Sequence, residues 1–290
     1  ANGGLVVVAC DDPSQHSSQN EQDSRFYADF AMVPCFEPSD QQEAYDMVRE
    51  AFEYSESRHI PVLMRLTTRM AHSRAVVSTG EILEENQVKF PGPQLASNWV
   101  TLPANARKRV RQLADDVLAF TADSEDSQDN AFVKGTDASV GIIACGIAYN
   151  YLMENFPDGC PYPVLKVTRY PFPKKQAREL ASMCSRIIVM EEGQPLIEER
   201  LRGLLYDGDN AALTISGRLD GTLPRTGELT PDCVRAAVGL APTGNKAASQ
   251  VAVPRPPALC QGCGHRDFYT ALNVALERYE PQARVFSDIG

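Results

Sequence analysis

Short apolar runs, each followed by a helical pattern, constrain the fold of this chain more than any other feature. The clearest runs are Leu5–Cys10, Val140–Cys145, Val164–Val167 and Ile187–Met190. Runs of this length, rich in β-branched residues, are typical of strands buried on both faces of a parallel sheet. Because strands and helices alternate, we expect an α/β fold built from doubly wound parallel sheets.

Residues 1–79 have the pattern of half of such a domain. Ser18 and Glu21 have capping-box spacing, which predicts a helix from Gln19 to about Phe30. Ser39 and Gln42 have the same spacing and predict the start of a second helix. The strands predicted in this part are 5–10, 32–36 and one that opens at Pro61 and ends in 65–69.

The rest of the chain repeats the alternation around one acidic, Ser-rich linker over 123–130. Helices are predicted over 104–120, from Gly146 through Phe156, from Pro173, from after Glu192 to about Leu205, and over 231–238. A further helix containing Phe268 and Leu276 precedes a strand over 283–286. Gly141 and Gly146 lie five residues apart, and a tight strand-to-helix turn explains them better than a nucleotide site.

Composition excludes several classes of protein. A net charge of -10 argues against a nucleic-acid partner, which calls for a basic face. No apolar run approaches the roughly 20 residues of a membrane span, and residues 1–9 lack the basic region of a signal peptide. The 8 cysteines are scattered, and Cys10, Cys145 and Cys184 fall in apolar patterns, as reduced core cysteines do. We therefore expect a cytoplasmic protein.

Cys260 and Cys263 form a C-x-x-C motif, which can aim both sulfurs at one centre. The motif favours iron–sulfur ligation, while structural zinc, a redox dithiol and plain packing stay open. Zinc would require further ligands, and the histidines show no zinc-ligand spacing. The histidines are His16, His59, His72 and His265.

The residues around this motif suit a bound group. Gly262 and Gly264 let the backbone come close to a ligand. His265 and Arg266 precede a predicted helix, where an anion would be held. They are candidates for contact with a cofactor diphosphate, or for hydrogen bonds that tune an iron–sulfur cluster. The alternative is that they only cap the helix.

Polar residues also crowd the carboxyl end of the first strand, which is where open α/β sheets place ligands. We expect His16, Ser17 and Gln19 to face a substrate or cofactor. Arg65 and Arg69, at the end of the third strand, suit a carboxylate or the phosphates of coenzyme A. An ion pair within the chain explains these arginines equally well.

Three motifs together resemble the large (alpha) subunit of the indolepyruvate ferredoxin oxidoreductase family. The motifs are Gly3–Val8 with Asp11–Pro13 and His16–Arg25, then Gly141–Tyr149 with Leu165–Lys166 and Glu191–Pro195, then Cys260–Arg266 with Asp288–Gly290. They occur in the family's order over nearly the whole chain. Gln261 and Gly264 stand where the family often has Pro, and neither difference removes a ligand.

The resemblance implies transketolase-like, thiamine-diphosphate-binding domains. It divides the chain into the C-terminal half of the pyrimidine-side domain (1–79), a crossing segment with the acidic linker (80–135), a transketolase C-terminal-like domain (136–206), an irregular connection (207–258) and the start of the pyrophosphate-side domain (259–290). The chain would be an internal fragment. The residue that activates the aminopyrimidine and the magnesium ligands would then lie outside residues 1–290, and Asp288 would lie in a loop at the cofactor's edge.

The activity implied is oxidative decarboxylation of an aryl 2-oxo acid with coenzyme A. The products would be an acyl-CoA and CO2, with electrons passing through 4Fe-4S clusters, ligated in part by Cys260 and Cys263, to ferredoxin. Thiamine diphosphate with Mg2+ would be the cofactor, and a smaller subunit the partner. Alternatives are a pyruvate-type or phenylglyoxylate-type enzyme, or a non-catalytic C-x-x-C metal-binding module. By itself, the fragment is expected to be inactive.

Overall fold

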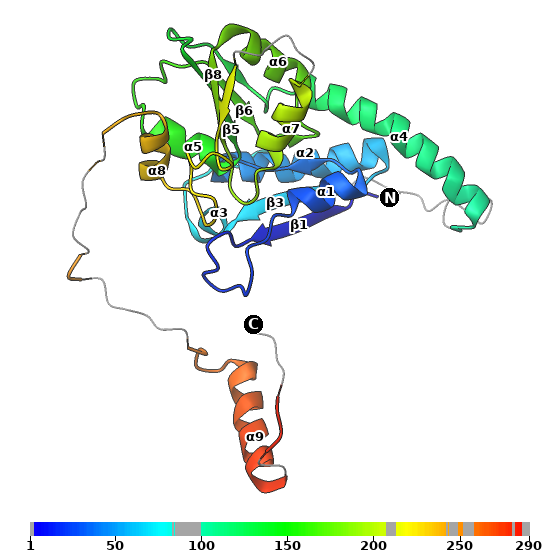
Figure 1. Cartoon of the computed structure of the whole chain (residues 1–290). Helices are drawn as coiled ribbons and strands as arrows, with labels where there is room; N and C mark the ends of the chain where they lie inside the picture. Colours follow the sequence, from blue (N-terminus) through cyan, green and yellow to red (C-terminus); the bar gives the residue numbers. More distant parts are fainter. Residues whose placement is uncertain are drawn as a thin grey trace. The chain divides into compact units, whose positions relative to one another are not determined.

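The computed structural model of the chain describes residues 3–82, 84, 100–206, 213–241, 243, 249–251, 258–279 and 282–285. These residues belong to two compact units, Ala1–Pro242 and Thr243–Gly290. The first unit contains two sheets with helices around them (Figure 1). Within the described residues, no helix combines the length and apolarity that a membrane span requires.

The first sheet has four strands in the order β1-β3-β2-β7. β1 (Val6–Asp11) and β2 (Cys35–Phe36) both run parallel to β3 (Val62–Thr67), whereas β7 (Arg169–Tyr170) pairs antiparallel with β2. The helices in this part of the chain are α1 (Arg25–Ala31), α2 (Gln41–Arg58) and α3 (Thr68–His72). Met47 and Ala51 of α2 pack with strand residues, so α2 covers one face of this sheet.

The second sheet has five strands in the order β4-β6-β5-β8-β9. The strands are β4 (Phe132–Val133), β5 (Val140–Cys145), β6 (Val164–Val167), β8 (Arg186–Met190) and β9 (Thr214–Ser216). α6 (Lys174–Met183) and α7 (Leu196–Leu204) share one core cluster with the sheet. α5 (Ile147–Glu154) and α8 (Pro231–Ala237) share the other. Helices thus cover both faces of a mostly parallel sheet, which confirms the predicted α/β fold.

The two sheets share a core in the first unit. Ala28 and Cys35 belong to the same buried cluster as Leu165 and Ile187 of the second sheet. β7 extends the first sheet although it follows β6 in the chain. The predicted parts 1–79 and 136–206 therefore pack against each other, while the five-part division itself stays a prediction.

Two predicted helix starts are wrong. The first helix begins at Arg25 instead of Gln19, because hydrogen bonds to Asp11 and Asp12 hold the preceding residues in a loop. In the second helix the N-cap is Asp40, whose side chain accepts a hydrogen bond from the Glu43 N–H at 2.9 Å.

Three predictions about strands are also wrong. The strand expected over 32–36 is only Cys35–Phe36, because Met32 ends α1 with a left-handed backbone at φ 56°. β1 lies at the edge of its sheet, so Val8 is 54% exposed and Cys10 is exposed, although both were expected in a core. Residues 283–285 form no strand, and Phe286 lies outside the described residues.

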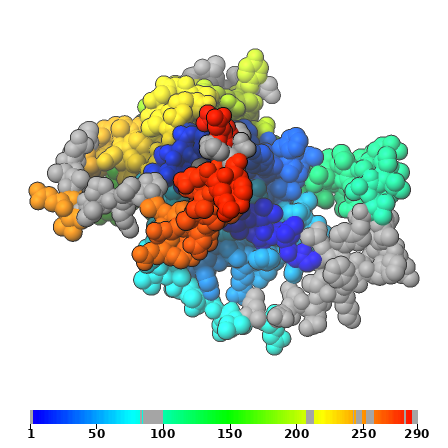
Figure 2. All heavy atoms as spheres, turned by 90° about the horizontal axis from the view of Figure 1, so that it is seen from below, coloured from blue at the N-terminus to red at the C-terminus, as the bar shows by residue number. Residues whose placement is uncertain are grey.

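The helix predicted over 104–120 is longer in the structure. α4 spans Pro103–Asp126 and takes up part of the predicted acidic linker. Phe120 and Ser124 are its buried residues, and its N-terminal part stands out from the body of the first unit in both views (Figure 1, Figure 2). In the second unit, α9 (Gly264–Tyr279) follows the C-x-x-C motif, as predicted.

Candidate functional site

The loop after β1 is fixed by two consecutive carboxylates. Asp11 accepts a hydrogen bond from the Ser24 N–H at 2.8 Å, at the far end of the loop. Asp12 accepts hydrogen bonds from the N–H groups of Ser17 at 2.8 Å and Ser18 at 3.2 Å. The two carboxylates thus hold both ends of the polar segment in which substrate-facing residues were predicted.

Asp12 is ionised at neutral pH. Burial alone would raise its pKa, but hydrogen bonds from the Ser17 N–H and from the Thr68 hydroxyl, at 2.8 Å, lower the pKa to about 2. Since Thr68 begins α3 directly after β3, Asp12 ties the loop after β1 to the end of the neighbouring strand.

These ties create an open pocket of about 560 Å³ at the carboxyl ends of β1 and β3. Its walls are His16, Ser17, Thr68, Arg69, His72, Ser73 and Glu228. Three residues predicted from sequence, His16, Ser17 and Arg69, therefore face one space. Gln19 is exposed and does not line this pocket.

Glu228 links the two sides of the pocket. Its carboxylate lies 2.7 Å from Arg69 Nη2 and 3.5 Å from His16 Nε2. The Arg69 guanidinium also lies 5.9 Å from the centre of the Tyr151 ring. Glu228 thereby sets the position of the Arg69 guanidinium and of the His16 imidazole.

Sequence reasoning missed Glu228, Thr68 and His72. Glu228 belongs to a segment poor in pattern and reaches the pocket through contacts far apart in the chain. The Glu228 N–H donates to Ser14 Oγ at 2.8 Å, and the Gly227 N–H donates to Glu21 at 2.9 Å. No local signal could have predicted these contacts, whereas Thr68 lies within the segment already identified at the end of β3.

Arg65 lies on β3 but does not reach the pocket. Its side chain is 0% exposed and forms ion pairs with Asp11, at 2.5 Å, and with Glu37. Its third nitrogen donates to the backbone carbonyl of Glu192 at 3.1 Å. Arg65 thus forms the ion pairs within the chain that the sequence left open as one explanation.

A second buried arginine joins the loop after β1 to the loop after β8. Arg25 donates to Asp23 at 2.6 Å and to Glu191 at 2.8 Å. Burial alone would raise the pKa of Asp23, but Arg25 and Arg65 lower that pKa strongly. Glu191 also accepts hydrogen bonds from the Ile197 and Glu198 N–H groups at the start of α7. These buried charges link the loop after β1, in the first sheet, to the loop after β8, in the second sheet.

The C-x-x-C motif belongs to the second unit. Cys260 is exposed, Cys263 is half-buried, and Cys263 Sγ lies 3.6 Å from His265 Nδ1. Gly262 has a φ of 76°, a backbone conformation that favours glycine. Gly264, His265 and Arg266 are exposed in the first turn of α9, and Asp288 lies outside the described residues.

Two accessible thiols suit part of a metal ligand set, because iron–sulfur clusters are held by four cysteine thiolates or similar sets. Among the described residues, no group of three or more His, Cys, Asp or Glu side chains is placed to hold a metal ion. The described part of the chain therefore places two free thiols in one turn, without a complete set of metal ligands around them.

The pocket itself suits acid–base chemistry on an anionic ligand. His16 lines the pocket and is 53% exposed, and imidazole is the side chain that most often serves as a general acid or base in enzymes. Arg69 and His72 can hold a carboxylate or phosphate, and the Ser17 and Thr68 hydroxyls can orient it. The fold and pocket define an α/β protein with an open polar pocket at the carboxyl ends of parallel strands.

Comparison with known proteins gives the family. No protein-family model matches the chain. The chain is 39% identical over 286 residues to the indolepyruvate oxidoreductase subunit IorA of Methanothermobacter thermautotrophicus, covering 96% of this chain and 46% of that protein. It is 34% identical over 304 residues to the subunit of the same name from Archaeoglobus fulgidus, and this alignment covers 100% of this chain and 48% of that protein. By sequence the chain belongs to the family of these IorA subunits, and it spans about half the length of the curated relatives it matches.

Two solved structures are similar at low identity. One is a split gene transketolase, described as an inactive beta4 tetramer, with a TM-score of 0.42, 15% identity, and 80% of this chain and 64% of that chain covered. The other is a 2-oxoglutarate:ferredoxin oxidoreductase from Magnetococcus marinus, with a TM-score of 0.47 and 14% identity. The match covers 72% of this chain and 45% of that chain.

Proposed function

We propose that this chain is part of an enzyme that oxidatively decarboxylates aryl 2-oxo acids of the indolepyruvate type. Coenzyme A would accept the acyl group, CO2 would be released, and the electrons would pass through iron–sulfur clusters to ferredoxin. A smaller subunit would complete the enzyme. The observation that carries this proposal is the 39% identity, over nearly the whole chain, to a protein named indolepyruvate oxidoreductase subunit IorA.

The first unit would contribute the substrate side of the site. His16 and Ser17 would face the 2-oxo acid, with Gln19 from the same exposed loop. Arg69, which is 45% exposed, would pair with the substrate carboxylate or with a coenzyme A phosphate. Glu228 would keep the His16 and Arg69 side chains facing the pocket.

The second unit would contribute to the cofactor and to electron transfer. Gly262, Gly264, His265, Arg266 and Asp288 are the candidates for contact with thiamine diphosphate. The exposed N-terminus of α9 supports this role, because the first N–H groups of a helix favour an anion. Thiamine diphosphate, bound with Mg2+, would supply the stabilised carbanion that decarboxylation requires.

Cys260 and Cys263 would supply two ligands of a 4Fe-4S cluster. Their accessibility and their placement in one turn support this role. His265, 3.6 Å from Cys263 Sγ, would tune the cluster through its hydrogen bond to the sulfur.

The test is a substrate comparison with the full-length protein and its partner subunit, purified without oxygen. Indolepyruvate, pyruvate and phenylglyoxylate would each be offered with coenzyme A, and ferredoxin reduction would be followed. We expect the highest kcat/KM for indolepyruvate. Turnover of pyruvate or phenylglyoxylate at an equal or higher kcat/KM would assign the enzyme to one of those types.

The rival hypothesis is a non-catalytic metal-binding module. It predicts that the full-length protein binds metal through Cys260 and Cys263 and turns over none of the three acids. The 290-residue chain alone is expected to reduce no dye with a 2-oxo acid and to bind no thiamine diphosphate. Turnover by the chain alone would contradict this.

A further inference from the structure

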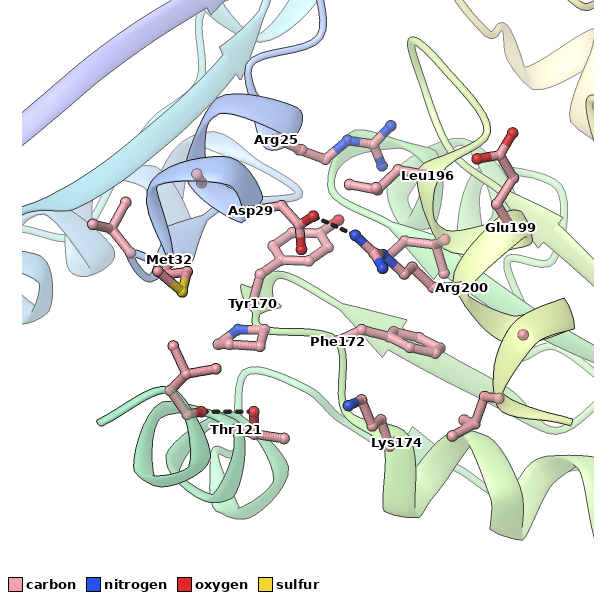
Figure 3. A pocket seen from close by; sticks show the side chains of 17 residues that line it. Arg25, Asp29, Met32, Thr121, Tyr170, Phe172, Lys174, Leu196, Glu199 and Arg200 are labelled. Carbon is pink, nitrogen blue, oxygen red and sulfur yellow. Dashed lines mark hydrogen bonds and ion pairs between the residues drawn. The ribbon is translucent and has the colours of Figure 1, made fainter. Parts of the chain in front are cut away.

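A second pocket, of about 500 Å³, lies between helices of the first unit (Figure 3). Its walls come from α1, α4, the segment Tyr170–Phe172, the first residue of α6, and α7. None of its lining residues also lines the pocket of His16 and Arg69. Pockets that bind small organic molecules usually measure ~300–1,000 Å³ and are mostly apolar.

The walls of this pocket are aromatic and aliphatic. Tyr170 and Phe172 are 8% and 6% exposed, so packing fixes both rings. The Tyr170 hydroxyl donates to Glu37, which satisfies its polar group outside the pocket. Met32 and Leu196 complete the apolar wall. Such a surface suits a flat ring rather than a strongly hydrated ligand.

Three cations line this pocket, and the buried Arg25 is already paired with Asp23 and Glu191, which leaves Lys174 and Arg200. In the view of Figure 3 the charged ends of Lys174 and Arg200 lie toward the space between the helices, whereas the Glu199 carboxylate points away from it. Lys174 forms no ion pair with any residue that the structure describes. Arg200 pairs with Asp29, but these side chains are 55% and 51% exposed, and exposed pairs contribute little. Lys174 is therefore available to an anionic ligand, whereas Arg200 would be shared between the ligand and Asp29, which lines the same pocket.

We propose that this pocket binds an aromatic monocarboxylate. The ring would lie against Tyr170 and Phe172, and the carboxylate would pair with Lys174 and Arg200. The ligand would contact α1, which lies in the part of the chain that forms the first sheet, and α6 and α7, which pack on the second sheet. Binding would therefore stabilise the packing of these two parts against each other. This site is separate from the His16 pocket and does not depend on the proposed function.

The experiment uses the 290-residue chain and calorimetric titration with phenylacetate. Phenylacetamide has the same ring without the charge, and hexanoate has the charge without the ring. We expect phenylacetate to bind and to raise the melting temperature. Each of the other two probes should bind about tenfold more weakly or not at all, because each lacks one of the two interactions.

Two variants and one matched control locate the site. Lys174→Gln should weaken phenylacetate binding about tenfold, since a charge-assisted hydrogen bond is lost. Lys175→Gln, at the neighbouring exposed position outside the pocket lining, should bind like the original chain. Gly203→Leu should abolish binding and leave the chain folded, because a Cβ at Gly203 meets no atom within 4 Å and the side chain fills space at the pocket.

Three results would overturn the proposal. The first is phenylacetate binding that is equal in Lys174→Gln and Lys175→Gln. The second is binding that survives in Gly203→Leu, which would place the ligand elsewhere. The third is hexanoate or phenylacetamide binding as tightly as phenylacetate, which would exclude an aromatic carboxylate as the ligand class. Absence of any phenylacetate binding would overturn it as well.

Discussion

Arg65 and Arg69 lie four positions apart and have different roles. Arg65 is 0% exposed among the carboxylates of Asp11, Asp23 and Glu37. Arg69 is 45% exposed at the pocket and pairs with Glu228. The sequence identified both as candidates, but their burial depends on the register of β3 against β1 and β2 and on the segment after β8. Residue spacing alone contains none of this information.

Arg65→Met is expected to destabilise the chain by about 3–5 kcal/mol, because it leaves Asp11 and Glu37 as buried carboxylates without their cation. Arg69→Met, which removes an exposed ion pair, should cost about 0–1 kcal/mol. Urea unfolding of the two variants measures the difference. Equal unfolding midpoints would show that the buried pairs contribute no more than the exposed one.

Thr68→Val is expected to raise the pKa of Asp12 from about 2 toward the ordinary value of 3.8, because the hydroxyl donor at 2.8 Å is lost. The folded-state pKa lies below the ordinary value. Asp12 therefore stabilises the fold above about pH 4, and this contribution is lost as the pH falls toward 2. The carboxyl carbon chemical shift of Asp12, followed against pH, measures both values. An unchanged titration midpoint in Thr68→Val would contradict the assigned hydrogen bond.

At the scale of elements, the sequence predicted which segments are strands and helices better than where they begin. The strands β5, β6 and β8 lie where the apolar runs predicted them, because a buried parallel strand has a distinct composition. The start of α1 was missed because Asp11 and Asp12 hold residues 17–24 in a loop, and these bonds compete with the Ser18 and Glu21 capping box.

Gly146 shows how a turn between elements is specified. Its φ is 50°, and a Cβ there would lie 2.6 Å from Glu37 Cγ. Glu37 cannot move away, because it pairs with Arg65 and accepts from Tyr170. The glycine was correctly interpreted as a tight strand-to-helix turn, although its contact with Glu37 from the other sheet could not be predicted.

Gly146→Ala is expected to cost roughly 1–3 kcal/mol, from the strained backbone together with the contact with Glu37. Gly203→Ala is the matched control on α7, where no atom obstructs a Cβ, and it should stabilise the chain by roughly 0.5–1 kcal/mol. Thermal unfolding should show a lower melting temperature for Gly146→Ala and a higher one for Gly203→Ala. A stabilising Gly146→Ala would show that this turn does not require glycine.

At the scale of the whole molecule, buried charges join the two sheets of the first unit. Arg25 and Arg65 reach from the first sheet to the loop after β8, and Glu228 reaches back to the loop after β1. The sequence predicted the two α/β parts and three of the pocket residues, His16, Ser17 and Arg69. It could not predict that the irregular segment around Glu228 forms one wall of this open pocket, since that contact arises only from long-range packing.

The most direct test of the account is the activity of a His16→Ala variant of the full-length protein assembled with its partner subunit. If the proposed function holds and His16 transfers a proton in the reaction, indolepyruvate turnover with coenzyme A should fall at least about a hundredfold. His59→Asn, which changes a histidine at the end of α2, should keep turnover near that of the unchanged enzyme. If His16→Ala folds normally and keeps turnover within about twofold, a change far below the effect of losing an acid–base group, the pocket at the ends of β1 and β3 does not face the reaction.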